Sequence, residues 1–206
     1  MKSTLPRLIL ASASPRRLDL LRQIRYTPDL VIPTAIDEAP QPREMPQALA
    51  LRLARAKAMA VAPDYPKDFV LGADTVVACG RRILPKAETE EEARQCLSLL
   101  SGRRHRVYGG ICVIAPIKEG IAPHVQRLAR SDVLFKRLST TEMATYLATG
   151  EWHGKAGGYA IQGMAAAFVK RLAGSYSNVV GLSLYDVVSV LQGLGYAPAL
   201  GLQASS

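Results

Sequence analysis

The sequence predicts an α/β fold built on a mixed sheet. Short apolar runs typical of buried strands alternate along the 206 residues with segments of helical periodicity, and this alternation indicates the α/β class. Two strand-like segments, near residues 105–115 and 124–137, follow each other without a helix between them, so the sheet is expected to be mixed. The chain contains no internal repeat and no Gly/Ser linker, so we expect one domain over residues 1–206, with room for two lobes and a cleft.

The first half of the chain is predicted to alternate strands with helices. Ser14 and Pro15 suit the N-cap and the first position of a helix, and Cys79-Gly80 suits a turn between strands. In order, the predicted elements are a strand at 8–11, a helix near 15–24, a proline-rich loop containing Ile36-Asp37-Glu38, a helix over about 46–60, a buried strand at 69–77 and a short strand after the turn.

Two capping boxes mark helix starts in the second half. Each pairs a hydroxyl side chain at the N-cap with a glutamate three residues later, and a glycine closes each helix. These residues are Thr89, Glu92 and Gly102 for the first helix, and Ser139, Glu142 and Gly150 for the second. The remaining predicted elements are the strands near 105–115 and 124–137, a glycine-rich loop, a strand around 165–171 and a single last helix from about Asn178 to Gly193.

Composition limits the partners and the compartment. The net charge of +9 and the pI near 9.7 favour anionic partners, which include nucleic acids, acidic lipids and phosphorylated small molecules. The basic residues are scattered in pairs and only 6% of residues are aromatic, which weakens the case for a base-stacking surface. No run approaches the roughly 18 apolar residues of a membrane span, and no signal-peptide pattern opens the chain, so we expect a cytoplasmic protein without a membrane partner.

The three cysteines indicate core packing. Cys79, Cys96 and Cys112 are odd in number and lack the spacing of metal ligands. A disulfide framework or a zinc cluster therefore has little support, and we expect small core residues at these positions.

The segment 8–21 is the strongest candidate for a binding site. Its strand, hydroxyl-rich turn and helix start place Arg16 and Arg17 in the first helical turn, where unpaired backbone N–H groups and the positive end of the helix dipole attract anions. Two cations at the positive end of the dipole destabilise the helix, so their presence favours a bound polyanion at the helix N-terminus. The alternative is a capped surface helix with solvated arginines.

Asp74 stands inside an otherwise apolar strand, where an unpaired carboxylate would cost several kcal/mol. One interpretation is that its carboxylate is bonded to nearby backbone. The other is that it lies at a cleft, either as a general base or as a ligand of magnesium or manganese, with the loop acids Asp37 and Glu38 completing the metal site.

Lys57 lies on the face of its helix that should pack against the core, so its ammonium either reaches the surface or meets a phosphate in a cleft. Lys86 by itself indicates only a loop lysine.

The glycine-rich stretch 154–163 is a second candidate for ligand contact. Its glycines allow close backbone approach to a ligand, and Gln162 can both donate to and accept from a base edge. A tight turn without a ligand is the alternative. The chain carries neither a Walker A motif nor a Rossmann fingerprint, so the usual phosphate-loop labels do not apply.

In combination, these motifs resemble the Maf family of nucleoside triphosphate pyrophosphatases. The match covers nearly the whole chain and depends on many motifs in order, which makes it far more specific than any one of them. The matching segments are Leu10-Ala11-Ser12-Ala13-Ser14-Pro15-Arg16-Arg17, Asp37-Glu38, Arg55-Ala56-Lys57, Gly72-Ala73-Asp74-Thr75-Val76-Val77, Lys86, Ser101-Gly102, 155–163, Gly174-Ser175-Tyr176 and Asn178-Val179-Val180-Gly181-Leu182. The departures are Pro85-Lys86-Ala87, where the family usually has Gly-Lys-Pro, and Gly181-Leu182-Ser183-Leu184, where it usually has Gly-Leu-Pro-Leu.

The resemblance implies an elongated mixed sheet flanked by helices, with two lobes around a central cleft, an architecture related to that of inosine triphosphate pyrophosphatases. It also implies an enzyme, often dimeric, that hydrolyses a nucleoside triphosphate to the monophosphate and pyrophosphate with a divalent metal. Asp74 matches the proposed catalytic proton acceptor of the family. Members that act on dTTP and UTP have arginine, threonine and glutamine where this chain has Arg16, Thr75 and Gln162, whereas members that act on 7-methyl-GTP typically have tryptophan, glutamine and glutamate.

These residues combine into one hypothesis for dTTP and UTP hydrolysis. Asp74 and Glu38 engage Mg²⁺ or Mn²⁺ and the attacking water, and Thr75 and Gln162 hydrogen-bond the pyrimidine. The residues expected to neutralise the triphosphate are Ser12, Ser14, Arg16, Arg17, Lys57 and Lys86. The alternatives are a nucleic-acid-binding or cell-division regulatory protein without turnover, and an inosine or xanthosine triphosphate pyrophosphatase. We expect no stable nucleic-acid complex, with a homodimer as a candidate assembly.

Overall fold

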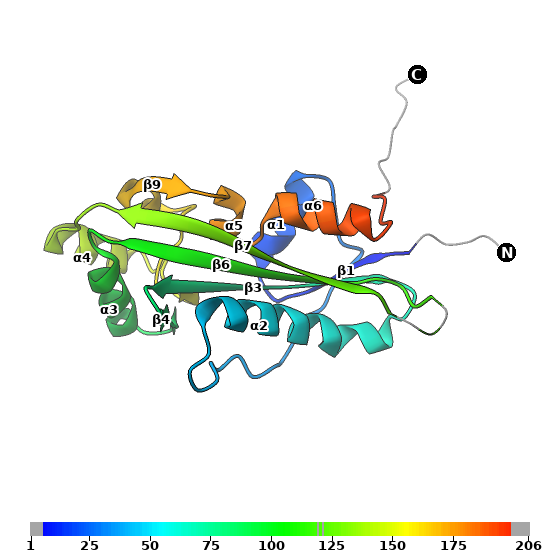
Figure 1. Cartoon of the computed structure of the whole chain (residues 1–206). Helices are drawn as coiled ribbons and strands as arrows, with labels where there is room; N and C mark the ends of the chain where they lie inside the picture. The colour runs from blue at the N-terminus through cyan, green and yellow to red at the C-terminus, as the bar shows by residue number, and fades with distance from the viewer. Residues whose placement is uncertain (1–5, 119, 121, 199–206) are drawn as a thin grey trace, which may run out of the picture.

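A computed structural model describes residues 6–118, 120 and 122–198 of the chain. Its centre is a seven-stranded sheet with the order β2-β1-β3-β6-β7-β9, to which β4 adds by pairing with β3 (Figure 1). Because β1 pairs in parallel with β2 and β3 while β6, β7 and β9 pair antiparallel, the predicted mixed sheet is confirmed. The strands are β1 (Leu8–Ala11), β2 (Leu30–Val31), β3 (Phe69–Cys79), β4 (Arg82–Leu84), β6 (Arg104–Ile114), β7 (His124–Phe135) and β9 (Val169–Ala173), and the short strands β5 (Lys86–Ala87) and β8 (Lys155–Ala156) form a separate antiparallel pair.

Helices flank both faces of this sheet. Figure 1 shows α2 along one face and α1 and α6 on the other, with α3 and α4 toward the end of the molecule where β9 lies. The helices are α1 (Pro15–Gln23), α2 (Pro46–Val61), α3 (Glu90–Leu100), α4 (Thr140–Ala148), α5 (Tyr176–Val180) and α6 (Leu184–Gly193), with 3₁₀ turns η1 (Ala62–Asp64) and η2 (Met164–Phe168). Over the part of the chain that the structure describes, none of these helices is long and apolar enough to span a membrane.

The helix α2 approaches the sheet closely because two glycines remove side chains beneath it. A Cβ on Gly110 in β6 would lie 2.0 Å from the Ala50 carbonyl oxygen, and one on Gly72 in β3 would lie 2.3 Å from that of Ala54. Both distances are far below van der Waals contact, so larger residues would push the helix away. This close packing is what brings Lys57 of α2 within reach of β3.

The helix starts agree well with the sequence. Both capping boxes are present, with Thr89 and Ser139 each accepting from the backbone N–H three residues later. Ser14 occupies the N-cap of α1 and Pro15 its first position, although the Ser14 side chain makes no capping hydrogen bond. The predicted packing of the cysteines is confirmed, because Cys96 and Cys112 are buried and Cys79 is half-buried against the core.

Two predicted elements in the last quarter were wrong. The strand expected around 165–171 begins only at Val169, because residues 164–168 form η2, in which the Met164 N–H donates to the Glu151 carboxylate (2.8 Å) and the Ala166 N–H to the Gly163 carbonyl (3.0 Å). The single helix expected over 178–193 is two helices, α5 and α6.

The break between α5 and α6 occurs at Gly181. This residue has φ = 152°, a conformation open to glycine but strained for other residues. The N–H groups of Gly181 and Leu182 both donate to the Ser177 carbonyl oxygen, at 3.0 and 2.9 Å, which closes α5. Ser183 then takes the N-cap position of α6, where its hydroxyl donates to the Asp186 carboxylate.

One edge of β3 has a gap between its two neighbours. On that edge β1 ends its pairing at Gly72, and β4 begins at Val77. The other edge of β3 pairs continuously with β6 from Val70 to Ala78. Residues 73–76 therefore lie in the sheet on one side and face a gap between strands on the other, in the middle of the molecule.

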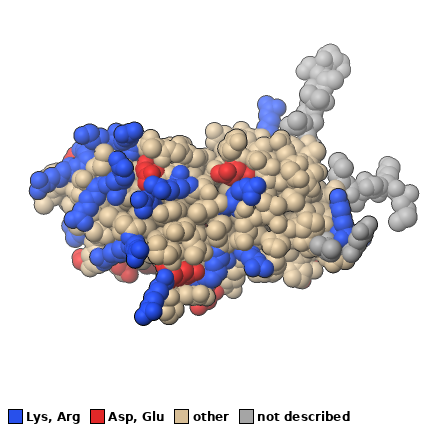
Figure 2. Space-filling view, viewed as in Figure 1, with Lys and Arg blue, Asp and Glu red and all other residues tan. Residues whose placement is uncertain are grey.

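The surface charge is uneven. Figure 2 shows Lys and Arg side chains gathered at the end of the molecule where β9 and α4 lie. Register places Arg104 of β6 and Arg171 of β9 on either side of Leu134, in one row across the sheet. In the next rows, Arg106 and Arg130 both approach Asp132, at 3.5 and 2.9 Å. We call these four arginines the basic patch.

Candidate functional site

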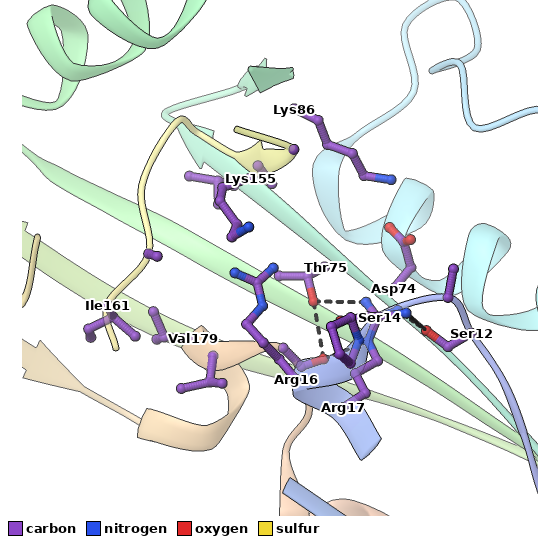
Figure 3. Close-up of a pocket in the computed structure, with 18 of the residues that line it drawn as sticks. Ser12, Ser14, Arg16, Arg17, Asp74, Thr75, Lys86, Lys155, Ile161 and Val179 are labelled. Carbon is purple, nitrogen blue, oxygen red and sulfur yellow. Dashed lines mark hydrogen bonds between the residues drawn. The ribbon is translucent and has the colours of Figure 1, made fainter. Parts of the chain in front are cut away.

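A cavity of about 350 Å³ lies at the gap in β3, within the size range of small-molecule sites. The close-up in Figure 3 shows side chains from α1, β3, β8 and the loop after β8 pointing into it from different sides. All ten residues predicted for the site line this one cavity: Ser12, Ser14, Arg16, Arg17, Glu38, Lys57, Asp74, Thr75, Lys86 and Gln162. Asp37 is absent from the lining, and its carboxylate instead accepts from the Ala39 N–H at 2.9 Å.

The buried carboxylate of Asp74 is paired with Lys57. Asp74 is 4% exposed and Lys57 5%, and the Lys57 ammonium lies 2.6 Å from Asp74 Oδ1. The same ammonium lies 2.7 Å from Glu38 Oε1, and Lys86 contacts the other Glu38 oxygen. Two carboxylates and two ammonium groups thus alternate along one wall. Of the alternatives that the sequence left open, Lys57 faces the cleft, and Asp74 pairs with a side chain there.

Glu38 remains ionised far into the acid range. Burial alone would raise its pKa, but hydrogen bonds from Lys57 and Lys86 and the charges of both lysines outweigh that effect and lower the pKa to about 2. The Glu38 carboxylate therefore stays negatively charged at any physiological pH and can bind a cation.

The acidic pair fits a divalent cation that arrives with a ligand. Because Glu38 and Asp74 both contact one ammonium, their oxygens converge on a single cation position. Within the described ranges, no group of three or more His, Cys, Asp or Glu side chains could hold a metal ion by itself. Mg²⁺, however, is commonly held by one or two carboxylates together with substrate phosphates and water. The pair meets that requirement once the Lys57 ammonium moves aside.

Arg17 connects three segments of the wall. Its Nε donates to the Gly181 carbonyl at 2.9 Å, Nη1 to Ser12 Oγ at 3.0 Å and Nη2 to Thr75 Oγ1 at 3.2 Å. Thr75 in turn donates to the same Gly181 carbonyl at 3.3 Å (dashed lines in Figure 3). Burial lowers the pKa of Arg17, against the opposing charges of Asp74 and Glu38.

Arg16 differs from its neighbour. Among the described residues its side chain has neither a hydrogen-bond nor an ion-pair partner within the protein, and it extends toward the same part of the cavity as Lys155 (Figure 3). Burial and the charge of Arg17 lower the pKa of Arg16, and burial and the charge of Arg16 lower that of Lys155. Two cations held close together without a carboxylate between them favour an anion in the cavity.

The far end of the cavity is apolar and is formed partly by the glycine-rich loop. Ile161 and Val179 lie there (Figure 3), and Gln162 stands exposed beside Ile161. The loop turns through Gly157 and Gly158, both with φ near 70°, and a Cβ on Gly157 would lie 2.8 Å from Val77 Cγ1. The loop is thus both a tight turn and a wall of the cavity.

Two tyrosines hold that loop against the core. The Ala160 N–H donates to the Tyr146 hydroxyl at 3.1 Å, and the Tyr159 hydroxyl lies 2.9 Å from His105 Nε2. Both tyrosines are buried. The position of Gln162 is therefore set by contacts deep in the core.

The sequence did not single out several lining residues. Lys155 lies in the glycine-rich stretch, where its position beside Gly154 and Gly157 was a usable signal. Thr34 carried no signal, because a threonine in a proline-rich loop is ordinary, and Val179 and Val180 stood in a family-matching segment without an assigned role. Only the fold brings them to the cavity.

Comparisons with known proteins identify the family of the chain. The family model described as "Maf-like protein" matches residues 7–194. The dTTP/UTP pyrophosphatase of Paramagnetospirillum magneticum is 63% identical over 93% of this chain and 98% of its own length, and that of Caulobacter vibrioides is 58% identical over 94% and 98%. Among solved structures, the Ham1 protein of Staphylococcus aureus is similar with a TM-score of 0.43 and 16% identity, over 62% of this chain and 71% of that one. On the family match and these identities, the chain belongs to the Maf family.

Proposed function

We propose that this protein is a nucleoside triphosphate pyrophosphatase that hydrolyses dTTP and UTP to the monophosphate and pyrophosphate. The relatives that share 58–63% of their residues with it carry that name. The observation that carries the proposal is one cavity lined by the buried Asp74 carboxylate and by the cations Arg16, Arg17, Lys57 and Lys86, with an apolar end for a base. Arginine, threonine and glutamine at positions 16, 75 and 162 support the pyrimidine type.

The triphosphate would lie at the polar end of the cavity. Its charge would be met by Arg16, Lys57 and Lys86, with the hydroxyls of Ser12 and Ser14 as hydrogen-bond donors and Arg17 adding positive charge behind them. Charge spreads over the phosphoryl oxygens and the leaving pyrophosphate in the transition state, and fixed cations in a partly closed site stabilise it with little reorganisation.

Asp74 would accept a proton from the attacking water. The water oxygen forms a bond to the α-phosphorus while the bond from that phosphorus to the bridging oxygen breaks, and the pyrophosphate leaves with the electron pair of that bond. Lys57, which lies 2.6 Å from one Asp74 oxygen, would move from that carboxylate to a phosphate oxygen. Glu38 and Asp74 would hold Mg²⁺ or Mn²⁺, which when bound supplies positive charge to the phosphate oxygens.

The base would occupy the apolar end. Gln162, which lines that end, would hydrogen-bond a pyrimidine edge, and Thr75 would support the wall between the two ends. A site that hydrogen-bonds a base discriminates because a wrong base leaves its polar groups unpaired.

The test is a screen of purified protein with dTTP, UTP, 7-methyl-GTP, ITP and ATP in Mg²⁺ or Mn²⁺, with and without EDTA. Monophosphate, pyrophosphate and orthophosphate are measured separately. We expect equal amounts of monophosphate and pyrophosphate from dTTP and UTP, and loss of turnover in EDTA. Release of orthophosphate alone, or preferred turnover of ITP, contradicts the proposal.

The basic patch is the one observation that favours the rival class of nucleic-acid-binding proteins. That class predicts tight binding that weakens steeply with salt, and no hydrolysis. Binding of a nucleic-acid backbone does not require a buried carboxylate inside a cationic cavity. We therefore propose turnover without a stable nucleic-acid complex. Titration of labelled DNA and RNA at two salt concentrations distinguishes the two.

We further infer a cytoplasmic location, because the proposed substrates are the nucleotides of that compartment, and a homodimer on the family resemblance. Light scattering of the purified protein tests the assembly. A mass of twice 22.2 kDa is the expected result.

A further inference from the structure

We propose that Arg17 and Thr75 are positioning residues: Arg17 clamps the gap in β3 so that Asp74 is held toward the substrate, while Arg16 is the arginine that binds the phosphates. This inference rests on the proposed pyrophosphatase function. It assigns different roles to Arg16 and Arg17, which the sequence alone does not distinguish as phosphate-binding residues.

The donors of Arg17 are largely committed within the protein. Three of its nitrogens donate to Gly181, Ser12 and Thr75, and the residue is only 7% exposed. A planar guanidinium spreads its donors over three nitrogens and so reaches three acceptors on different segments, whereas the three donors of an ammonium all leave a single nitrogen. Turning Arg17 toward a phosphate would leave buried acceptors unpaired, which is costly. Arg16, without such partners among the described residues, carries no such cost.

The clamp lies where β3 lacks a strand neighbour. Between Gly72 and Val77 one edge of β3 faces the gap, and Arg17 reaches across it to Thr75. Thr75 and Asp74 are consecutive in a strand, so their side chains point to opposite faces of the sheet. Fixing Thr75 from one face therefore fixes the direction in which Asp74 leaves the other face, toward Lys57.

The far end of the clamp is itself anchored. The Gly181 carbonyl accepts from both Arg17 and Thr75, and the unusual φ of Gly181 places it there. The preceding helix α5 is fixed by Asn178, whose side-chain NH₂ donates to the Val107 carbonyl at 3.1 Å and to Ser131 Oγ at 3.0 Å. The clamp thus ties one edge of β3, through the turn at Gly181 and helix α5, to β6 and to the next strand, β7.

This arrangement gives Thr75 an indirect role at the base end. Its hydroxyl accepts from Arg17 and donates to Gly181, so its hydrogen is used inside the protein. Thr75 then affects the base through the turn that carries Val179 and Val180, both of which line the cavity.

Kinetics of matched arginine variants test the division. In Arg17→Lys the charge stays but the fork is lost, and we expect kcat for dTTP to fall roughly 100-fold with KM changed less than about threefold. In the control Arg16→Lys we expect KM to rise roughly tenfold with kcat largely kept. Equal effects of the two variants on KM, with kcat of Arg17→Lys intact, would overturn the clamp.

A double-mutant cycle tests whether Arg17 and Thr75 act as one unit. Thr75→Val removes the hydroxyl that Arg17 holds, and Thr75→Ser restores it. We expect Thr75→Ser to recover most of the activity lost in Thr75→Val, and Arg17→Lys/Thr75→Val to be within about threefold of Arg17→Lys alone. Multiplicative losses in the double variant would overturn the proposal.

Two measurements do not depend on turnover. Tripolyphosphate binding by calorimetry should weaken roughly tenfold in Arg16→Lys and stay within about twofold in Arg17→Lys. Hydrogen exchange of a peptide covering residues 73–76 should quicken in Arg17→Lys and not in Arg16→Lys. The opposite pattern in either measurement refutes the clamp, whether or not the wild-type protein hydrolyses dTTP and UTP. Failure of the wild-type protein to hydrolyse either nucleotide refutes the proposed function and leaves these two measurements as the test of the clamp.

Discussion

At the scale of single residues, Asp74 shows how burial and chemistry are reconciled. A carboxylate in an apolar strand is costly unless a cation compensates it, and Lys57 lies 2.6 Å away. The compensating residue comes from α2, 17 positions earlier in the chain. The sequence predicted both residues as candidates, but only packing of α2 on the glycines of the sheet could show that they form a pair.

Replacing Asp74 with asparagine should abolish most turnover. Asparagine keeps the shape and loses the proton acceptor, so kcat for dTTP should fall by about 10²–10⁴-fold. Pyrophosphate release is the measurement, with circular dichroism to check folding. The matched control is Asp37→Asn, whose exposed carboxylate lies outside the cavity lining and whose turnover should equal wild type. Comparable losses in both variants would contradict a specific role for Asp74.

Replacing Gln162 with glutamate should change substrate choice without changing stability. Gln162 is exposed at the base end of the cavity, so the change removes an amide donor and adds a negative charge there. We expect kcat/KM for dTTP and UTP to fall at least tenfold with the melting temperature within about 2 °C of wild type. A loss of stability with unaltered relative turnover of dTTP, UTP and 7-methyl-GTP would show that Gln162 serves the loop and not the base.

At the scale of elements, the sequence predicted what local chemistry decides. The capping boxes at Thr89 and Ser139 fix helix starts by themselves, and β1, β3, β6 and β7 have strong apolar patterns. The division of α5 from α6 was missed because the apolar periodicity continues through Gly181, although a glycine is a local signal for a helix end. The turn is held further by hydrogen bonds from Arg17 and Thr75 to the Gly181 carbonyl, which no local pattern records.

The packing of α2 makes a prediction about glycines. Gly110→Ala places a Cβ 2.0 Å from the Ala50 carbonyl, so α2 must shift, and we expect a loss of about 2–3 kcal/mol in the free energy of unfolding. Because the shift also moves Lys57, kcat should fall as well. The control is Gly193→Ala at the end of α6, where a Cβ meets no atom within 4 Å and the expected change is a gain of up to about 1 kcal/mol. Urea unfolding measures both, and equal effects would contradict the close approach of α2.

At the scale of the whole molecule, whose net charge is +9, positive charge is concentrated in two places. Part of it forms the basic patch, and part lines the cavity, where Arg16, Arg17, Lys57, Lys86 and Lys155 meet only two carboxylates, Asp74 and Glu38. The net charge can be counted from the sequence, but the two places where the cations gather cannot, because these cations come from segments far apart in the chain. The prediction of an anion site depended instead on the local pattern at residues 8–21.

The stability of the whole molecule should depend on His105 between about pH 6.5 and 4. Its ring packs edge-on against Phe135, 4.9 Å between centroids, and burial lowers its pKa to about 4. In that window the unfolded chain binds a proton that the folded protein does not, so the free energy of unfolding rises with pH. The loss on acidification should approach about 3 kcal/mol by pH 4, where both states become protonated.

The carboxylates act in a lower window that overlaps the acid end of this one. Glu38 and Glu142 have pKa values of about 2, so the stability that their ion pairs contribute is complete above about pH 5.5 and is lost progressively as the pH falls toward 2. Urea unfolding from pH 8 to about 5.5 therefore reports on His105 before these carboxylates contribute. We expect a falling midpoint in wild type and a nearly flat one in His105→Gln, whose amide keeps a partner for the Tyr159 hydroxyl 2.9 Å away. If the urea midpoint falls equally with pH in both proteins, the pH dependence of stability does not come from His105.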